Sequence, residues 1–261
     1  MHTIYENFVL ANEIEDQYNS MLDLARFCTV DNSLVGVPGM IKKINVYSAT
    51  NGTEKLAMGA GNSKDIEVSY ADKEYEILMA QNRFKYFDEQ EMTDPMVVTT
   101  GMRHMAVDMF NHVNADVFAE FNKATLSVAL SGSDYFGAFV DASAVLNVEH
   151  MEGLEKFGFV SNTDMAKIRK ALKDDLKYVE AFARNGYVGT VADWNLYVKK
   201  DAVPGTIVGG TREAVTLFNK RGVEVEQLRE ADIRQNTVWS RKYYLAALTD
   251  ATKAVKITLG G

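Results

Sequence analysis

TDPMVVTTGMRHMAVDMFNHVNADVFAEFNK, residues 93–123, is the longest stretch of the chain with a sustained helical period. Its apolar side chains recur every three or four residues, which places them on one face of a helix. They are Val98, Met102, Met105, Met109, Val113, Val117 and Phe121, with Ala106, Phe110 and Phe118 beside them. Asp94 is a suitable N-cap, and Pro95 suits the first turn. We predict a helix of about 28 residues, roughly 40 Å long, with one side buried.

The composition is that of a soluble globular protein. The chain has 261 residues, of which 47% are hydrophobic and 25% charged, enough for a substantial core. Its net charge of −8 argues against non-specific binding to nucleic acid, which needs clustered Lys and Arg. The N-terminus lacks the order of a signal peptide, and no stretch approaches the ~20 apolar residues of a membrane span. We therefore expect a protein made in the cytosol, with no membrane partner.

The single cysteine, Cys28, excludes an internal disulfide and is typical of a reducing compartment. A nucleophilic role is one interpretation of this residue. However, Cys28 lies in an apolar run with Leu24 and Phe27, and cysteine is among the most buried residue types. We favour a structural role.

Two segments before the long helix have apolar residues without an obvious local partner. Residues 1–35 are expected to form an arm, with an amphipathic helix over 13–26. An apolar patch precedes that helix and consists of Ile4, Tyr5, Phe8, Val9 and Leu10. Residues 41–46 and 66–79 then alternate like strands around the glycine-rich segment 50–65. We predict a long two-stranded ribbon with a flexible tip, and because such a hairpin is marginal alone, we expect it to lie on another subunit.

The remainder of the chain mixes helices and strands without a repeating βαβ pattern. A break with small residues is predicted at 125–139. Helices are predicted at 142–157, at 164–185 with Thr163 or Asp164 as the cap, and at 211–219. Strands are predicted at 158–160, 187–200, 206–208, 223–228 and 237–259, with turns at 201–205 and 249–252, the latter a hairpin. The fold class is therefore α+β.

One row of polar residues on the long helix has side chains that bind metals. His104, Asp108, His112 and Asp116 are four residues apart, and Glu120 continues the row. A metal site usually needs ligands from a second element, and the sequence has no second histidine cluster. We interpret the row as the polar flank of the helix, and a metal-dependent enzyme is the alternative. We predict no catalytic, cofactor-binding or metal residue and no cofactor.

Other candidate motifs lack the required spacing. Residues 59–64, GAGNSK, match neither a Walker A loop nor a dinucleotide fingerprint, so we assign them to the ribbon tip. Gly209-Gly210-Thr211 stands at an expected strand-to-helix junction, but two glycines are not a fingerprint. Asp174 and Asp175 lie among lysines and indicate a charged helix face. The sequence has no GxSxG elbow and no CxxC motif.

Several segments, in this order, resemble the major capsid proteins of tailed bacteriophages, which have the Hong Kong 97-type capsid fold. Residues 81–94 are similar to that family's passage from an extended loop to a long spine helix. Residues 186–198, GYVGTVADWNLYV, are similar to its "GyvGtv.gw.vyv" strand. Three further segments resemble those that close such proteins: 203–206, 209–215 and 225–229.

The resemblance implies an organisation for the whole chain. It consists of an N-terminal arm (1–35), an extended β-hairpin loop (36–90), the spine helix with the peripheral domain (91–129), an axial domain (130–236), and a last pair of strands returning to the peripheral domain (237–261). It also implies hexamers and pentamers that close an icosahedral shell around packaged double-stranded DNA.

Partners and location follow from the same resemblance. They are other copies of the chain, a portal protein, a decoration protein, and passive contact with DNA in the virion, after assembly in the host cytoplasm. No scaffolding segment precedes the arm, so we expect a separate scaffold or none. Lys55 and Lys64 lie in the loop, but we predict no crosslink. An encapsulin-like compartment and a monomeric binding module that uses the ribbon as an arm are the alternatives.

Overall fold

The structure is a computed structural model, and it describes residues 3–6, 24–49, 52–132, 134–146, 155–173 and 189–259. Its helical elements are η1 (Leu24–Phe27), α2 (Asp88–Thr93), α3 (Met96–Phe121), α4 (Tyr135–Val145), α5 (Asn162–Ala171) and η2 (Ala251–Lys253). Its strands are β1 (Thr3–Glu6), β2 (Thr29–Asp31), β3 (Ile41–Ala49), β4 (Val68–Glu76), β5 (Leu78–Phe87), β6 (Leu126–Ala129), β7 (Lys156–Val160), β8 (Thr190–Val191), β9 (Trp194–Val198), β10 (Thr206–Thr211), β11 (Val215–Glu230), β12 (Gln235–Leu248) and β13 (Ala254–Thr258).

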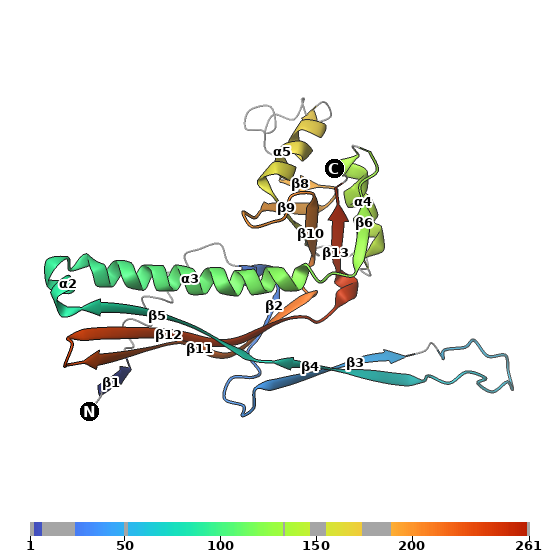
Figure 1. Ribbon diagram of the computed structural model, residues 1–261. Coiled ribbons are helices and arrows are strands. Elements are labelled where there is room, and N and C mark those ends of the chain that lie inside the picture. The colour runs from blue at the N-terminus through green and yellow to red at the C-terminus, as the bar shows by residue number, and fades with distance from the viewer. Residues whose placement is uncertain are drawn as a thin grey trace.

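The predicted long helix is confirmed as α3, and it lies along a sheet made of long strands (Figure 1). Its apolar stripe is buried from Met102 to Phe121. The Asp94 carboxylate accepts a hydrogen bond from the Met96 backbone N–H (3.0 Å), and Pro95 occupies the cap position. The helix begins there because α2 is a separate short helix that ends at Thr93.

The peripheral sheet, defined here as strands β1, β2, β5, β11 and β12, supports one side of α3. Its strand order is β1-β11-β12-β5, and β2 pairs in parallel with β11. The Asn82 side-chain amide donates to the Met105 carbonyl on α3 (2.8 Å). A Cβ added at Gly101 would lie 2.5 Å from the Phe84 ring, so the helix approaches β5 closely because Gly101 has no side chain.

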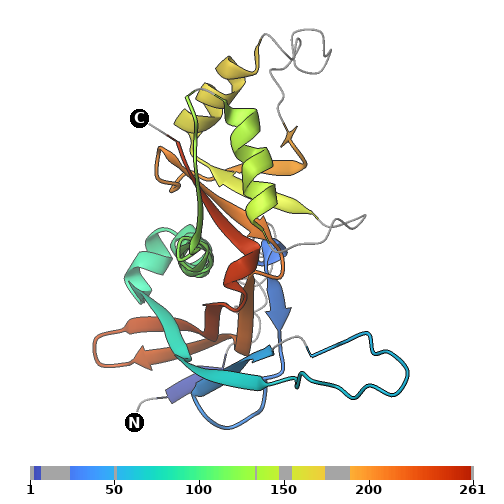
Figure 2. The same ribbon diagram turned by 90° about the vertical axis from the view of Figure 1, so that its right-hand side faces the viewer.

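The axial sheet, ordered β6-β13-β10-β7-β9-β8, rises from the C-terminal end of α3 (Figures 1 and 2). One face packs against α4 and α5 around Trp194, and the other packs against α3 and η1 around Phe121. Strands covered on both faces lose the alternation of apolar and polar residues. In β7 and β10, successive residues are indeed buried.

Two predicted helices are wrong in extent or kind. The helix expected at 211–219 is instead the start of β11, because Val215, Thr216, Leu217 and Phe218 are all buried and hide the period of two. The helix expected at 142–157 is α4, which begins at Tyr135 inside the predicted break. The Asp134 side chain caps it by accepting from the Gly137 N–H (2.8 Å).

Elements at either side of α4 also differ from expectation. Residues 126–129 form β6, and Phe157 belongs to β7, which confirms and extends the short strand expected at 158–160. Helix α5 confirms part of the helix predicted at 164–185, of which residues 174–185 lie outside the described residues. Its cap is Ser161, whose Oγ accepts from the Asp164 N–H (3.1 Å), and not Thr163 or Asp164.

The hairpin predicted at 249–252 is wrong, although a tight turn does lie there. Strand β12 pairs with β11 and β5, whereas β13 pairs with β10 and β6 in the axial sheet. The segment after Leu248 therefore crosses from one sheet to the other. The expected pair of C-terminal strands is therefore divided between the two sheets, with β12 in the peripheral sheet and β13 in the axial sheet.

Candidate functional site

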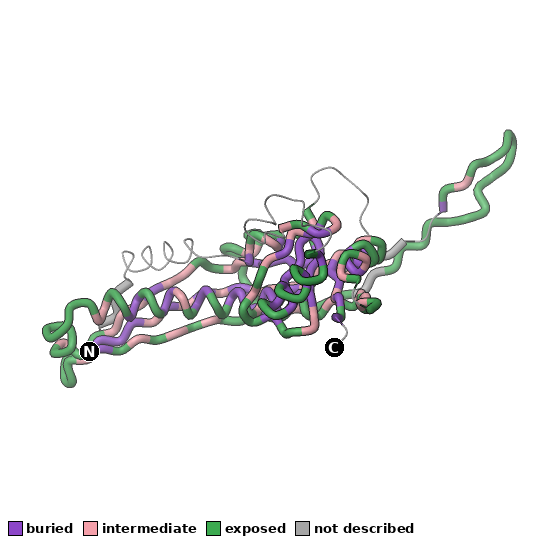
Figure 3. Tube along the Cα trace, turned by 90° about the horizontal axis from the view of Figure 1, so that it is seen from above, coloured by how far each residue is buried: buried purple, intermediate pink, exposed green. Residues whose placement is uncertain are grey.

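The ribbon, defined here as β3, β4 and residues 52–67 between them, extends away from both sheets (Figure 1). Strands β3 and β4 pair antiparallel over nine residues each, and neither joins another sheet in the described part of the chain. Figure 3 shows almost all of its described length as exposed. Its exposed apolar side chains are Ile41, Leu56, Met58, Ile66 and Val68. The predicted two-stranded ribbon is thus confirmed.

The tip of the ribbon is held by local hydrogen bonds. The Glu54 carboxylate accepts from the Ser63 backbone N–H (2.8 Å) and from its hydroxyl (2.7 Å). The bond from the backbone N–H is the main cause of a lowered Glu54 pKa. Residues 59–64, the glycine-rich motif, lie in this tip. No sequence signal marks Glu54, because its partner is nine residues away in an irregular loop.

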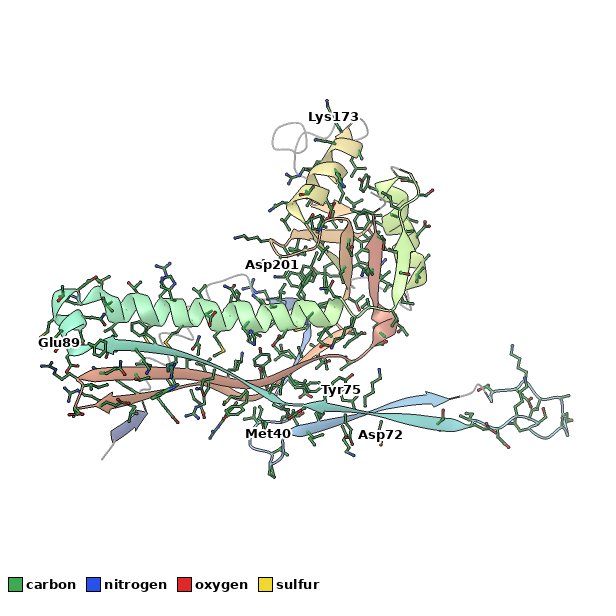
Figure 4. All side chains as sticks on the ribbon, viewed as in Figure 1. Met40, Asp72, Tyr75, Glu89, Lys173 and Asp201 are labelled. Atoms are coloured by element: carbon green, nitrogen blue, oxygen red, sulfur yellow. The ribbon has the colours of Figure 1, made fainter. Side chains whose placement is uncertain are left out.

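At its base the ribbon continues directly into the peripheral sheet (Figure 4, near Met40 and Tyr75). Ile77 is buried, and its N–H donates to the Met40 carbonyl (2.7 Å). The next residue, Leu78, already pairs with Tyr244 in β12. The strand predicted at 66–79 as part of the ribbon therefore ends at Glu76, and residues from Leu78 onward belong to the sheet.

The N-terminal segments lie against the same sheet. Strand β1 extends the edge of β11 with Thr3 opposite Arg229. The Leu24 N–H donates to the buried Asn114 side chain on α3 (3.0 Å), and Cys28 is fully buried in the adjoining core, as the structural interpretation expects. Within the helix expected at 13–26, residues 24–27 form a 3₁₀ turn. Residues 7–23, which include Phe8, Val9 and Leu10, lie outside the described residues.

The polar row on α3 makes structural hydrogen bonds to the peripheral sheet. Asp116 accepts from the Tyr244 hydroxyl (2.5 Å), and Asp108 accepts from the Asn82 amide (3.2 Å). Glu120 accepts from the Leu248 N–H (3.2 Å). His112 Nε2 lies 3.9 Å from Asp116, and both His104 and His112 are exposed. The three carboxylates of the row therefore face the peripheral sheet, whereas its two histidines are exposed.

A cavity of about 470 Å³ lies between the end of α3, β5 and β12. Its lining combines carboxylates of Glu76, Asp116 and Glu120 with apolar side chains such as Leu78 and Leu245. Nearby, burial raises the pKa of Tyr75, with a smaller contribution from the charge of Glu120. Over the described residues, no group of three or more His, Cys, Asp or Glu side chains is arranged to hold a metal ion.

Two sequence motifs remain, the glycine pair at 209–210 and the aspartate pair at 174–175. Gly209 and Gly210 lie inside β10, where an added Cβ would meet the Phe157 carbonyl oxygen at 2.0 Å and that of Lys253 at 2.1 Å. These glycines serve close strand packing, and no helix follows them. Asp174 and Asp175 lie outside the described residues. No helix in the described part of the chain is long and apolar enough to cross a membrane.

Comparison with known proteins identifies the architecture. No protein-family model matches the chain. It is similar to solved structures of viral shells: the mature capsid of bacteriophage PhiM1 has a TM-score of 0.69 at 10% identity, covering 92% of this chain and 88% of that one. The chain has the Hong Kong 97-type capsid fold. The predicted fold class, α+β with this capsid fold, is confirmed.

Two further proteins extend the comparison. The capsid fold also occurs in a virus-like particle from Pyrococcus furiosus, with a TM-score of 0.64, 12% identity, and coverage of 95% of this chain and 97% of that one. In sequence, the chain is 27% identical over 269 residues to the major capsid protein of Staphylococcus phage phiMR11. That alignment covers 97% of this chain and 92% of the relative, so the likeness is to a whole capsid protein.

Proposed function

We propose that this chain is the major capsid protein of a tailed bacteriophage, a structural protein that self-assembles into a closed icosahedral shell. The ribbon carries the proposal. It is two strands wide, exposes Met58 completely and Ile66 and Val68 by more than half, and pairs with no other strand among the described residues. A two-stranded hairpin is at best marginally stable alone in water. A neighbouring copy that covers it removes this instability.

The sequence relative supports the choice of a phage capsid over an encapsulin-like compartment. It matches nearly the whole chain and is a phage capsid protein, whereas the virus-like particle shares the fold at lower identity. We infer a structural role and no enzymatic activity, because the carboxylates of the α3 row are engaged by the peripheral sheet.

We infer finer features from the capsid fold and the charge of the chain. The subunits form hexamers and pentamers around packaged double-stranded DNA in the virion, after assembly in the host cytoplasm, with a portal protein and with separate scaffold or decoration proteins as further partners. An acidic subunit with a net charge of −8 suits such a container, since DNA that must move during packaging is not held by many phosphate contacts.

The proposed division of the chain keeps the arm at 1–35 and the extended loop at 36–90, with β5 shared between the loop and the peripheral sheet. The spine helix and peripheral domain span 91–129. The axial domain spans 130–236 as expected from the resemblance, but β11 belongs by its pairing to the peripheral sheet and β13 to the axial sheet. The last segment, 237–261, therefore connects both domains.

Electron microscopy and mass measurement of the purified chain test this function. We expect closed shells built of hexamers and pentamers. A chain that stays monomeric at high concentration in every condition contradicts the proposal. Particles from infected cells that contain double-stranded DNA support the phage assignment, whereas particles filled with a protein cargo support the encapsulin-like alternative.

A further inference from the structure

Helix α4 carries an apolar face that is exposed in the described part of the subunit. Its buried face, with Ala138, Phe139 and Ala142, packs on the axial sheet. On the other side, Phe136 and Val140 are 52% and 46% exposed. Phe136 and Val140 are one helical turn apart, so they form a continuous stripe and not scattered contacts. Single exposed apolar residues are ordinary, but an aromatic side chain grouped with others on one helix face indicates an interface.

Helix α5, on the same face of the axial sheet, presents a contrasting surface. Met165, Ile168 and Leu172 are buried, whereas Ala166, Arg169, Lys170 and Lys173 are exposed along one side. Arg169, Lys170 and Lys173 make no ion pair within the described residues. Figure 4 shows Lys173 projecting from the outer end of the axial unit, the axial sheet with α4 and α5. A small residue beside long basic side chains leaves room for an apolar group under their methylene stems.

The two surfaces are complementary in charge. The α4 stripe is bordered by Asp141, which is exposed and has no ion pair in the described part of the chain. Its carboxylate matches the excess of positive charge on α5. Complementary charges of this kind fix the register of an interface and exclude wrong pairings, while the apolar contact supplies most of the affinity.

The positions of the two helices suit a ring of identical subunits. In Figure 1, α4 lies on the side of the axial unit toward which the ribbon extends, and α5 lies at the top of the unit, farther from the ribbon. Figure 2, seen from the ribbon side, has α4 in front. One neighbour on that side therefore meets both the ribbon and the α4 stripe. A contact between two different surfaces of identical subunits generates a closed ring when the rotation closes.

We propose that the α4 stripe, formed by Phe136 and Val140, docks against the basic side of α5 on a second copy of this chain. In that contact Phe136 and Val140 cover Ala166 and the stem of Lys170, and Asp141 pairs with Lys170 or Arg169. The inference rests on the proposed function, since it assigns to a self-assembling shell the surfaces through which the axial units meet within a hexamer or pentamer.

The first test changes the apolar stripe in the full chain. Phe136→Ser with Val140→Ser should raise the protein concentration needed for shell assembly by about 10- to 100-fold, since each 1.4 kcal/mol of lost contact is a factor of ten. Val203→Ser is a matched control, because Val203 is 63% exposed on another part of the axial unit. The control should assemble like the wild type. A double variant that assembles at the wild-type concentration overturns the proposal.

The second test examines the charges and remains decisive if the first variant folds poorly. Asp141→Lys and Lys170→Glu should each weaken assembly, and together they should restore it to within about threefold of the wild type, because the pair is reversed in every copy. A combined variant no better than the worse single variant overturns the proposal. Wild-type protein that forms no shells contradicts the proposed function itself, whereas wild-type shells with unaffected variants contradict this contact alone.

Discussion

The axial sheet and the ribbon are both built from paired strands, yet they bury their side chains in opposite ways. The longest strand of the axial sheet, β10, has six residues, and each strand of the ribbon has nine. The short strands are covered on both faces, with Trp194 on one side and Phe157 on the other. The long strands expose Ile41, Ile66 and Val68. Strand length therefore does not decide which element is stable within the subunit.

The two elements obtain their stabilisation from different sources. Burial of apolar area contributes roughly 25 cal/mol per Å², and only the axial sheet obtains it inside one subunit. Beyond its own strand pairing, the described ribbon contacts the subunit mainly at its base, where the Tyr75 hydroxyl donates to the Leu248 carbonyl and the Lys42 ammonium lies over the Phe218 ring. A change in the axial sheet should therefore affect the folding of the subunit, and a change in the ribbon should affect assembly.

The largest effect is expected at Trp194, in the centre of the axial core. Its side chain is 1% exposed, and its ring N–H donates to the Phe139 carbonyl (3.1 Å) and the Ser143 hydroxyl (2.8 Å). Trp194→Ala should lower the free energy of unfolding by about 3–5 kcal/mol, because it leaves a large cavity. Denaturant unfolding of unassembled subunits measures this. Trp239, half-buried on the peripheral sheet, is the matched site, and Trp239→Ala should cost less. If the two variants lose the same free energy of unfolding, the axial core is not the main source of subunit stability.

Tyr244 tests the contact between α3 and the peripheral sheet. Tyr244→Phe removes the hydroxyl that donates to Asp116, and it should lower the free energy of unfolding by about 1 kcal/mol. The loss is modest because the Asp116 side chain is 46% exposed and remains hydrated. His112→Gln, on the exposed side of Asp116, should change stability by less than ~0.5 kcal/mol.

A variant with both row histidines replaced separates the two interpretations of the α3 row. If stoichiometric zinc or iron binds the wild type and is lost when His104 and His112 are both replaced, the row is a metal site and the polar-flank interpretation is wrong. Metal analysis of purified protein provides this measurement. We expect no stoichiometric metal to be lost on replacing the histidines.

The sequence predicts the elements in which apolar residues recur with a regular helix or strand period. It misses elements in which successive residues are all buried, because such elements show no period. The stripe of α3 follows a 3.6-residue period because only one side meets the peripheral sheet. The start of β11 was predicted as a helix because Val215 to Phe218 are buried in succession. The start of α4 was missed because the capping residue, Asp134, lies among small residues that are typical of a break.

Some features of the candidate site can also be predicted from the sequence, and others cannot. The ribbon is predictable, since its strands alternate and lack a local partner. The role of the row is only partly predictable, since Tyr244 is 128 residues from Asp116 and no local pattern connects them. The Glu54 contact in the tip and the apolar side of α4 are absent from the sequence prediction, because each depends on which side chains the fold leaves uncovered.

Substitutions at the ribbon tip should affect the stability of assembled shells and not that of the isolated subunit, the reverse of what we expect for Trp194. Leu56→Ser with Met58→Ser should change the free energy of unfolding of unassembled subunits by less than ~0.5 kcal/mol, because both side chains are exposed. The temperature at which assembled shells dissociate should fall, since a neighbour loses two apolar contacts. Leu56→Met with Met58→Leu keeps the apolar surface and serves as the control. A tip variant that unfolds the subunit but leaves shells intact refutes the assignment of the ribbon to assembly.

The smallest effect is expected at Asp88, where α2 meets the turn between β11 and β12. Its carboxylate accepts from Arg229 (2.7 Å) and Asn236 (2.7 Å), and the bond from Arg229 is the main cause of a lowered Asp88 pKa. Because the folded-state pKa is the lower one, this stabilisation is present above about pH 4 and is lost as the pH falls through the folded value. Asp88→Asn should therefore narrow the difference in subunit melting temperature between pH 6 and pH 3. Asp232→Asn, in the exposed turn nearby, should leave that difference as it is in the wild type. If both variants narrow it equally, the acid response belongs to overall charge and not to the Asp88 contact.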